Sequence, residues 1–286
     1  MSRAPENVLQ PLLFGHRPDI RLIAADMDGT LLDDNDNLPE NFVSLVLELR
    51  RQGIIFCPAS GRQYYNLLDR FDELAEEMVF IAENGSYVVS QGRELSSDCL
   101  APAAVTRLVV AARSLAASGA DIGAVICGKR SAYVERHDVR FRTEVTRYFA
   151  RLQQVDDLLE VTDDEVLKVA IFDFGSAEQT TAPALVPFEG THRVVLSGQH
   201  WVDVMNPVAN KGQAVRRLQQ SLGVTPAQTM VFVDFLNDLE MMDAAEFSFA
   251  MDNAHPQLRA RARYVAPSNS ENGVLRTISA VLGIVF

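Results

Sequence analysis

Two aspartates one residue apart follow a short apolar segment near the amino terminus. Residues 20–25 are mostly apolar and are expected to form a buried strand, and Asp26 and Asp28 come directly after it. The carboxyl end of a strand is where open α/β sheets bind ligands. Two carboxylates cannot both be buried and ionised unless a cation or protons offset them. The pair therefore indicates a cation-assisted site or, because Asp-Gly turns are common, a polar turn at Gly29.

Three other short segments carry residue types that bind anions or cations. Ser60-Gly61-Arg62 lies between an expected strand and an expected helix, where a hydroxyl and free N–H groups form an anion site or a simple helix cap. Lys211 begins an expected helix, where a cation sits in solvent or beside an anion. Asp234, Asn237 and Asp238 follow another strand, so Asp234 can join Asp26 at one sheet edge. Mg²⁺ prefers such oxygen ligands.

The elements around these segments predict an α/β fold with a parallel sheet. Strands and helices alternate in the first third and again in the last third of the chain. The expected strands are 20–25, 54–57, 79–82, 230–233 and 247–250. The expected helices are 39–49, 64–71, 211–222, 239–245, 256–263 and 273–282.

The middle of the chain has a different pattern, with hairpin signals around Gly92 and Gly198 and strands at 123–127, 132–134 and 166–172. This pattern predicts an α+β insert with an antiparallel sheet. We therefore expect one α/β domain at 19–86 and 191–286 that is interrupted by a separate module at 87–190, and a loosely ordered extension at 1–18. Helices are expected at 103–117 and 138–152, and a weaker one at 177–185.

Composition excludes several classes of protein. The 286 residues carry 26 basic and 38 acidic side chains, a net charge of −12, which disfavours binding to nucleic acid or to an anionic membrane. No segment is apolar for long enough to span a bilayer, and the first 18 residues do not resemble a signal peptide. Three widely spaced cysteines form no metal or disulfide pattern. The cysteines fit a reducing cytoplasm. We expect a monomer or a small homo-oligomer, although composition does not fix the assembly.

The order of the four segments resembles that of the haloacid dehalogenase superfamily of phosphatases, and more narrowly its Cof-type group, which has a large cap. The matching segments are Asp26–Leu31, Ser60–Arg62, Lys211 and Asp234–Asp238. Glu83-Asn84-Gly85 and Ser131-Ala132-Tyr133-Val134 are similar to bacterial sugar-phosphate phosphatases of this group. The resemblance covers about residues 20–283. It implies that the α/β domain at 19–86 and 191–286 is a Rossmann-like core and that the module at 87–190 is its cap.

The resemblance implies a Mg²⁺-dependent phosphatase that acts on phosphomonoesters of sugars or similar small metabolites. Asp26 would be the nucleophile that forms an aspartyl-phosphate, and Asp28 would be the general acid and then the general base. Mg²⁺ would be bound by Asp26, by the backbone carbonyl of Asp28 and by Asp234. The expected phosphate-binding groups are Ser60, Lys211, Asn237 and the backbone N–H groups of Met27 and Gly61. Further candidates for support or substrate contact are Thr30, Arg62, Asn84, Tyr133 and Asp238.

Bulky residues replace small ones at three places in the family pattern. The residue before the fourth-motif aspartate is usually glycine and is Val233 here, and the aspartate is followed by Phe235 rather than a small or polar residue. Val208 stands where a glycine commonly precedes the lysine motif. Because bulk could crowd the metal loop, a non-catalytic protein that binds phosphorylated metabolites is one alternative. A sugar phosphomutase or phosphotransferase that uses the same intermediate is another.

Overall fold

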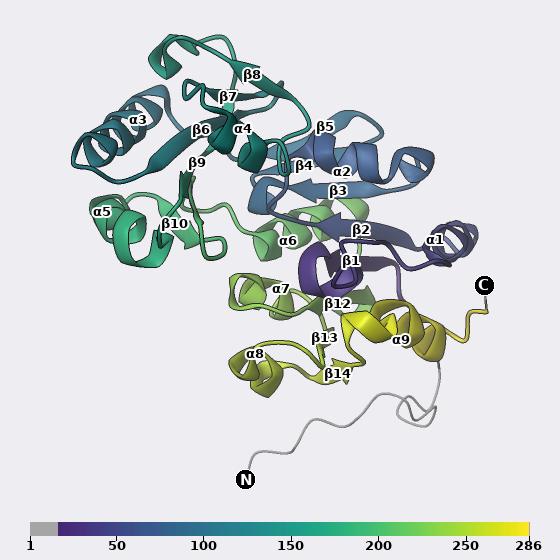
Figure 1. Ribbon diagram of the computed structural model, residues 1–286. Helices are drawn as coiled ribbons and strands as arrows, with labels where there is room; N and C mark the ends of the chain where they lie inside the picture. The colour runs from purple at the N-terminus through teal and green to yellow at the C-terminus, as the bar shows by residue number, and fades with distance from the viewer. Residues whose placement is uncertain (1–16, 286) are drawn as a thin grey trace.

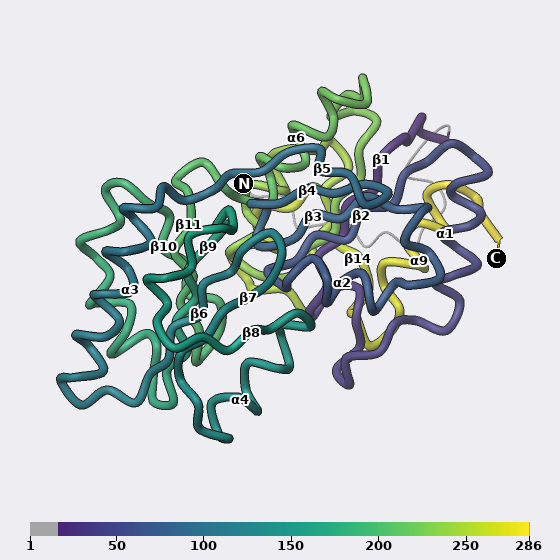
Figure 2. The backbone as a smooth tube through the Cα atoms, turned by 90° about the horizontal axis from the view of Figure 1, so that it is seen from above, coloured from purple at the N-terminus to yellow at the C-terminus, as the bar shows by residue number. Residues whose placement is uncertain are grey.

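A computed structural model describes residues 17–285, which form two packed parts, each built on its own sheet (Figures 1 and 2). We call residues 98–206 the insert and the rest of the described chain the core. The predicted extension at 1–18 lies outside the described residues, apart from its last two. Figure 2 separates the two parts, with the insert on the left and the core on the right.

Within the described residues, the core sheet has eight strands in the order β14-β13-β12-β1-β2-β3-β4-β5. Neighbours from β14 to β3 are parallel, whereas β4 and β5 are antiparallel additions at one edge. The strands are β1 (Leu22–Asp26), β2 (Ile55–Ala59), β3 (Val79–Ala82), β4 (Tyr87–Ser90), β5 (Arg93–Ser97), β12 (Thr229–Val233), β13 (Phe247–Met251) and β14 (Tyr264–Ala266). Because β1 pairs with β12, the carboxyl ends that carry Asp26 and Asp234 are neighbours.

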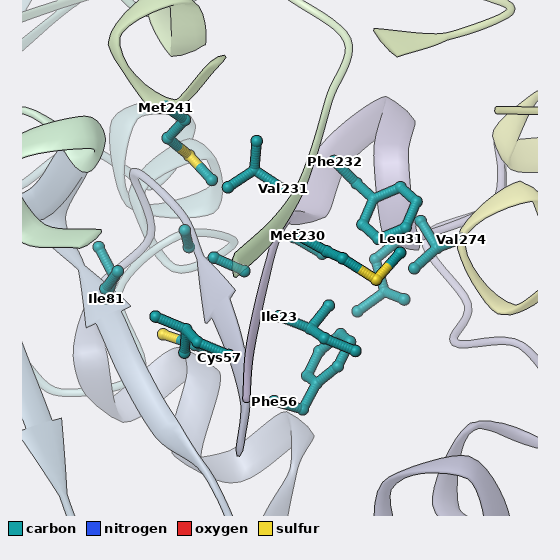
Figure 3. Packing of buried hydrophobic residues seen from close by; sticks show 14 of the residues in the cluster. Ile23, Leu31, Phe56, Cys57, Ile81, Met230, Val231, Phe232, Met241 and Val274 are labelled. Atoms are coloured by element: carbon teal, nitrogen blue, oxygen red, sulfur yellow. The ribbon is translucent and has the colours of Figure 1, made fainter. Parts of the chain in front are cut away.

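Helices cover both faces of the core sheet (Figure 1). Three lie on one side, α1 (Phe42–Arg51), α2 (Tyr64–Arg70) and α9 (Gly273–Leu282). Three lie on the other, α6 (Lys211–Leu222), α7 (Leu239–Met242) and α8 (Pro256–Arg261). Every residue of β1 and β12 is buried, as expected for parallel strands covered on both faces. Figure 3 shows Val231 on the side of Met241 from α7, and Phe232 on the side of Val274 from α9.

Within the described residues, the insert has a six-stranded sheet in the order β10-β11-β9-β6-β7-β8, antiparallel except between β7 and β8. The strands are β6 (Ile122–Gly128), β7 (Ala132–Val134), β8 (Leu152–Gln154), β9 (Val166–Asp173), β10 (Arg193–Leu196) and β11 (Trp201–Met205). The helices are α3 (Pro102–Ala117), α4 (Val139–Val145) and α5 (Ala182–Leu185). None of the helices in residues 17–285 combines the length and apolarity needed to cross a membrane.

Sheet pairing moves both boundaries of the predicted insert at 87–190. The hairpin β4–β5 pairs with β3 in the core sheet, and β10–β11 pairs with β9 in the insert sheet. The chain therefore leaves the core sheet after Ser97 and leaves the insert sheet after Met205. Local periodicity identified both hairpins, but the sheet that a hairpin joins depends on partners far away in the chain. The short strands β8 and β14 were not predicted, and α4 is shorter than the expected 138–152.

A tight turn after β3 brings the core sheet against the start of α6. Glu83, Asn84 and Gly85 all have positive φ, at 50°, 57° and 94°. A Cβ on Gly85 would lie 2.4 Å from the backbone oxygen of Asn210, the residue that precedes Lys211. Glycine therefore sets how closely α6, and with it the lysine, approaches the sheet.

We expect Gly85→Ala to lower the free energy of unfolding more than Gly92→Ala, measured by urea denaturation. Gly92 is the matched control, because its φ is 71° but no atom lies within 4 Å of its added Cβ. The control loses about 1 kcal/mol from backbone strain alone. Gly85→Ala should lose at least about 1 kcal/mol more, because α6 must shift. Equal losses in the two variants would contradict this close approach.

Candidate active site

A pocket of about 280 Å³ lies where the carboxyl ends of the core strands face the insert sheet. Both parts of the chain contribute to its lining, and most of the residues expected from the sequence are present. Those that line it are Asp26, Asp28, Ser60, Gly61, Arg62, Asn84, Lys211, Asp234 and Asn237. Met27 is buried directly after Asp26. Tyr133 is not among the lining residues, and its hydroxyl donates to Asp164 at 2.9 Å.

Three carboxylates and one amine meet at the core end of the pocket. Oxygens of Asp26, Asp234 and Asp238 lie within 4.8 Å of one another. Lys211 Nζ lies 2.5 Å from Asp26 Oδ1 and 2.9 Å from Asp238 Oδ1. Asp26, Lys211 and Asp238 are almost completely buried. The sequence expectation that Asp26 and Asp234 converge beside Lys211 is therefore met by the geometry.

The loop after β1 leaves room for Asp234. Gly29 has φ 78°, and a Cβ there would lie 2.3 Å from Asp234 Oδ2. The hydroxyl of the next residue, Thr30, donates to Asp234 Oδ1 at 3.2 Å. Thr30 therefore supports the carboxylate from within the core, as expected of a supporting residue.

Burial dominates the electrostatics of this acidic cluster. It raises the pKa of Asp26, against the lowering effect of Lys211. Burial followed by repulsion from Asp26 raises the pKa of Asp234 to about 8. Burial raises the pKa of Asp238 to about 7, and Lys211 opposes that rise. A single amine cannot neutralise three carboxylates, so the cluster takes up protons or a cation.

The cluster has the donors that a hard divalent cation requires. Its ligand atoms are carboxylate oxygens, the type that Mg²⁺ prefers. Asp238 Oδ2 is buried and has no hydrogen-bond partner among residues 17–285. An unpaired buried carboxylate oxygen is costly, and an ion that it can coordinate removes that cost.

The side chain of Asp28 lies outside this cluster, so only its backbone carbonyl remains the expected metal ligand, with its carboxyl group left for acid–base chemistry. Arg62 Nε donates to Asp28 Oδ2 at 3.2 Å, and its Nη2 donates to Asp28 Oδ1. Arg62 also pairs with Asp36 at 2.7 Å. Strand β1 ends at Asp26, so the two-residue repeat that would place both side chains on one face stops there. Asp238, expected only as a supporting residue, completes the three carboxylates instead.

The serine loop is held by the turn that follows β3. Ser60 is buried, and its Oγ accepts a hydrogen bond from the backbone N–H of Arg62 at 3.1 Å. The N–H of Asn84 donates to the carbonyl of Ser60 at 2.9 Å. A Cβ on Gly61 would lie 2.8 Å from Asn84 Oδ1, so glycine lets the two segments touch. Asn84 therefore acts on the loop as well as lining the pocket.

A second buried cluster contains residues to which the sequence gave no role. Lys168 Nζ lies 3.0 Å from Glu83 Oε2 and 3.1 Å from Asp203 Oδ2. Glu83 belongs to the core, whereas Lys168 and Asp203 come from β9 and β11 of the insert. Lys168 and Asp203 also line the pocket. The sequence feature that could have indicated this cluster is the single lysine, Lys168, within the apolar segment 166–172.

The bulky replacements noted in the sequence do not separate the carboxylates. Val233 is completely buried within β12, and Val208 is half exposed. Phe235 is also half exposed and lines the pocket, with its ring edge-on to His255 at a centroid distance of 5.9 Å. The three carboxylates therefore converge with these bulky residues in place.

Known proteins match this chain over most of its length. The family of haloacid dehalogenase-like hydrolases matches residues 23–278. A curated relative from Escherichia coli (strain K12), the 5-amino-6-(5-phospho-D-ribitylamino)uracil phosphatase YbjI, is 36% identical over 276 residues, covering 92% of this chain and 96% of its own. An HMP-PP phosphatase from Escherichia fergusonii is 29% identical over 244 residues, covering 84% of this chain and 87% of its own.

Solved structures share the whole fold. SMU.1108c from Streptococcus mutans UA159 superposes with a TM-score of 0.81 at 25% identity, covering 93% of this chain and 100% of its own. The subclass IIB sugar phosphatase BT4131 superposes with a TM-score of 0.77 at 19% identity, covering 93% of this chain and 100% of its own. The chain belongs to the haloacid dehalogenase-like hydrolases. Within that family it is a phosphoric monoester hydrolase with the large inserted cap.

We expect Mg²⁺ to raise the melting temperature, and to raise it more at pH 8.5 than at pH 6. The folded-state pKa values of Asp234 and Asp238, about 8 and 7, lie above their unfolded values. Stability from these groups is therefore complete below about pH 4 and is lost as pH rises towards 8 in metal-free protein. Mg²⁺ replaces the lost protons, so its benefit grows over that range.

Asp234→Asn and Asp243→Asn provide the comparison for this thermal measurement. Asp234→Asn should stabilise the metal-free protein at pH 8.5, because it removes a buried charge, yet abolish most of the response to Mg²⁺. Asp243 is an exposed partner of Arg261, and its variant should respond like the wild type. A response to Mg²⁺ that is independent of pH, or that survives in Asp234→Asn, would contradict the proposed ligand set.

Proposed function

We propose that the chain is a Mg²⁺-dependent phosphatase that hydrolyses phosphomonoesters of sugars or similar small metabolites through an aspartyl-phosphate on Asp26. The observation that carries this proposal is the buried cluster of Asp26, Asp234 and Asp238 around Lys211 at the end of a pocket. Such a cluster is costly to fold, and a structural role alone gives no reason for it to face a cavity.

Chemistry begins with attack by a carboxylate oxygen of Asp26 on phosphorus, which forms a new P–O bond while the ester P–O bond breaks. Asp28 donates a proton to the departing alkoxide. A water molecule then attacks phosphorus and gives a proton to Asp28, and the bond between phosphorus and Asp26 breaks to release phosphate. Arg62 holds the Asp28 carboxylate at the pocket, where it can serve both steps.

The remaining pocket residues position the phosphoryl group. Lys211, the hydroxyl of Ser60, the side chain of Asn237 and the N–H groups of Met27 and Gly61 are the proposed partners of its oxygens. Asp26, Asp234 and the backbone carbonyl of Asp28 would hold Mg²⁺, with Asp238 beside them. When bound, the ion supplies positive charge against which the negative charge of the transferred group is stabilised.

The pocket supports a substrate with an apolar or planar portion away from its phosphate. On the insert side the lining includes Trp201, Phe149, Tyr148 and Leu196, and Phe235 lines it from the core. Tyr148, Leu196 and Phe235 are each more than a third exposed. The Escherichia coli relative is named for a phosphorylated ribityl group joined to a uracil ring, and we extend that substrate class, a small phosphate ester with a ring, to this chain.

The setting of the protein follows from the same proposal. Such substrates are small intracellular metabolites, and all three cysteines are free, which fits a reducing cytoplasm. We retain a monomer or a small homo-oligomer as the assembly. The assembled carboxylates favour the catalytic reading over a protein that only binds phosphorylated metabolites.

We expect Asp26→Asn to reduce phosphate release from an aryl phosphate with Mg²⁺ by about a thousandfold or more, because the nucleophile is lost. Asp28→Asn is the matched variant. It should still release the aryl alcohol in a burst, because that leaving group needs little protonation, and then stall as the phosphoenzyme. Wild-type turnover of the aryl phosphate in Asp26→Asn would contradict the proposal.

With a sugar phosphate as the substrate, formation of an isomeric sugar phosphate without free phosphate would favour a mutase.

We expect uridine 5′-monophosphate to be hydrolysed with a kcat/KM at least about tenfold above that of ribose 5-phosphate. The two esters share the phosphorylated ribose, but only the first carries the planar uracil base. Aromatic contacts add about 0.5–1.5 kcal/mol each beyond burial. Phe235→Ala should lower kcat/KM only for uridine 5′-monophosphate. Val186→Ala, an exposed apolar control in the insert outside the pocket lining, should change neither. Equal kcat/KM values for the two esters would contradict the proposal that the pocket recognises a planar base.

A further inference from the structure

A buried lysine of the insert contacts the serine loop of the core. Lys168 is 3% exposed and lies on β9. In addition to its two carboxylate partners, its Nζ donates to the backbone carbonyl oxygen of Gly61 at 2.9 Å. This is a charge-assisted hydrogen bond in a site largely closed to water, where such bonds are strong.

The bond acts on a single peptide unit that also contacts the serine. The carbonyl of Gly61 and the N–H of Arg62 belong to the same planar peptide. That N–H donates to Ser60 Oγ at 3.1 Å. A hydroxyl that accepts through its oxygen keeps its own hydrogen for another partner, and Ser60 lines the pocket. Lys168 therefore fixes one end of a peptide whose other end orients the serine hydroxyl.

The turn behind the loop is held by the same residues of the insert. The N–H of Glu83 donates to the carbonyl of Arg62 at 3.1 Å. Glu83 and Asn84 both have positive φ, a backbone conformation that persists when surrounding contacts hold it. Lys168 pairs with Glu83, and the Asn84 side-chain amide donates to Asp203 Oδ2 at 2.8 Å. The insert thus supports the serine loop directly and through this turn.

We propose that Lys168 is a positioning residue for phosphate binding, acting through the Gly61–Arg62 peptide on the hydroxyl of Ser60. The phosphate site of the core is then complete only when β9 of the insert is docked against it. This inference rests on the proposed function, because it assigns the serine hydroxyl to a phosphoryl oxygen. It also gives the insert a part in holding phosphate, separate from contact with the rest of the substrate.

The experiment must distinguish the proposed positioning role of Lys168 from a purely structural one. Lys168→Met alone leaves Glu83 and Asp203 buried without a counter-charge, and such a loss destabilises the fold. The test therefore uses the neutral triple variant Lys168→Met/Glu83→Gln/Asp203→Asn. It removes the donor to Gly61 without leaving a buried unpaired charge.

The structure offers a matched control for this triple variant. Lys129 also belongs to the insert, and its Nζ lies 2.8 Å from Glu94 of the core hairpin and 2.9 Å from Glu165. It bridges the two parts of the chain in the same way but does not line the pocket. Lys129→Met/Glu94→Gln/Glu165→Gln removes an equivalent bridge away from the serine loop.

The experiment is a double-mutant cycle between the Lys168 triple variant and Ser60→Ala. The measured quantities are the dissociation constant of inorganic phosphate with Mg²⁺, by calorimetry, and kcat/KM for the aryl phosphate. All variants are studied well below their melting temperatures. The Lys168 triple variant should weaken phosphate binding and kcat/KM about tenfold in the wild-type background, and less than about twofold when Ser60 is already alanine. The Lys129 control should change neither by more than about twofold.

Two results would overturn the proposal. If the fold-changes caused by the Lys168 triple variant and by Ser60→Ala multiply when the changes are combined, Lys168 does not act through the serine hydroxyl. An unchanged phosphate affinity in the Lys168 triple variant would mean that it does not position the loop. The calorimetric arm needs no turnover, so it tests this inference even if the wild type hydrolyses no ester, whereas that failure would count against the proposed function alone.

Discussion

The candidate active site depends on the burial of three carboxylates around one amine. Carboxylate oxygens of Asp26, Asp234 and Asp238 lie within 4.8 Å of one another, and Lys211 neutralises only part of their charge. Burial of like charges is unfavourable, so the cluster persists only where the surrounding fold is rigid enough to hold it. The parallel sheet supplies that rigidity, because β1 and β12 are neighbours and are buried at every position. That cost is the physical reason for the cluster to take up protons or the proposed cation.

Close backbone approach is the second requirement, and glycine supplies it at two places. Gly29 makes room for the carboxylate of Asp234, and Gly85 lets the start of α6 reach the sheet so that Lys211 can enter the cluster. At both positions φ is positive, and an added Cβ would meet an atom at less than 3 Å. The acidic cluster is thus a product of backbone geometry as much as of its charged side chains.

The insert shares in the site rather than only covering it. Lys168 and Asp203 reach from its sheet to the serine loop and to the turn at Glu83. On the same face of the sheet, Trp201 and Ala170 continue the pocket as an apolar wall. One surface of the insert therefore combines the buried ammonium group of Lys168 with apolar side chains. In the proposed function, the first acts towards the phosphate and the second face the remainder of the substrate.

The sequence by itself determined the alternating core and the antiparallel insert, and it predicted Asp26, Ser60, Lys211 and Asp234, which line the pocket. Apolar periodicity and short motifs are local properties, so they can be read without the fold. The tertiary structure alone decided three things. It turned the Asp28 side chain to Arg62 and brought Asp238 into the cluster. It assigned the hairpin β4–β5 to the core sheet and β10–β11 to the insert. It joined Lys168 to Gly61 across 107 residues of chain. Each of these outcomes depends on partners distant in sequence, and local patterns carry no information about such partners.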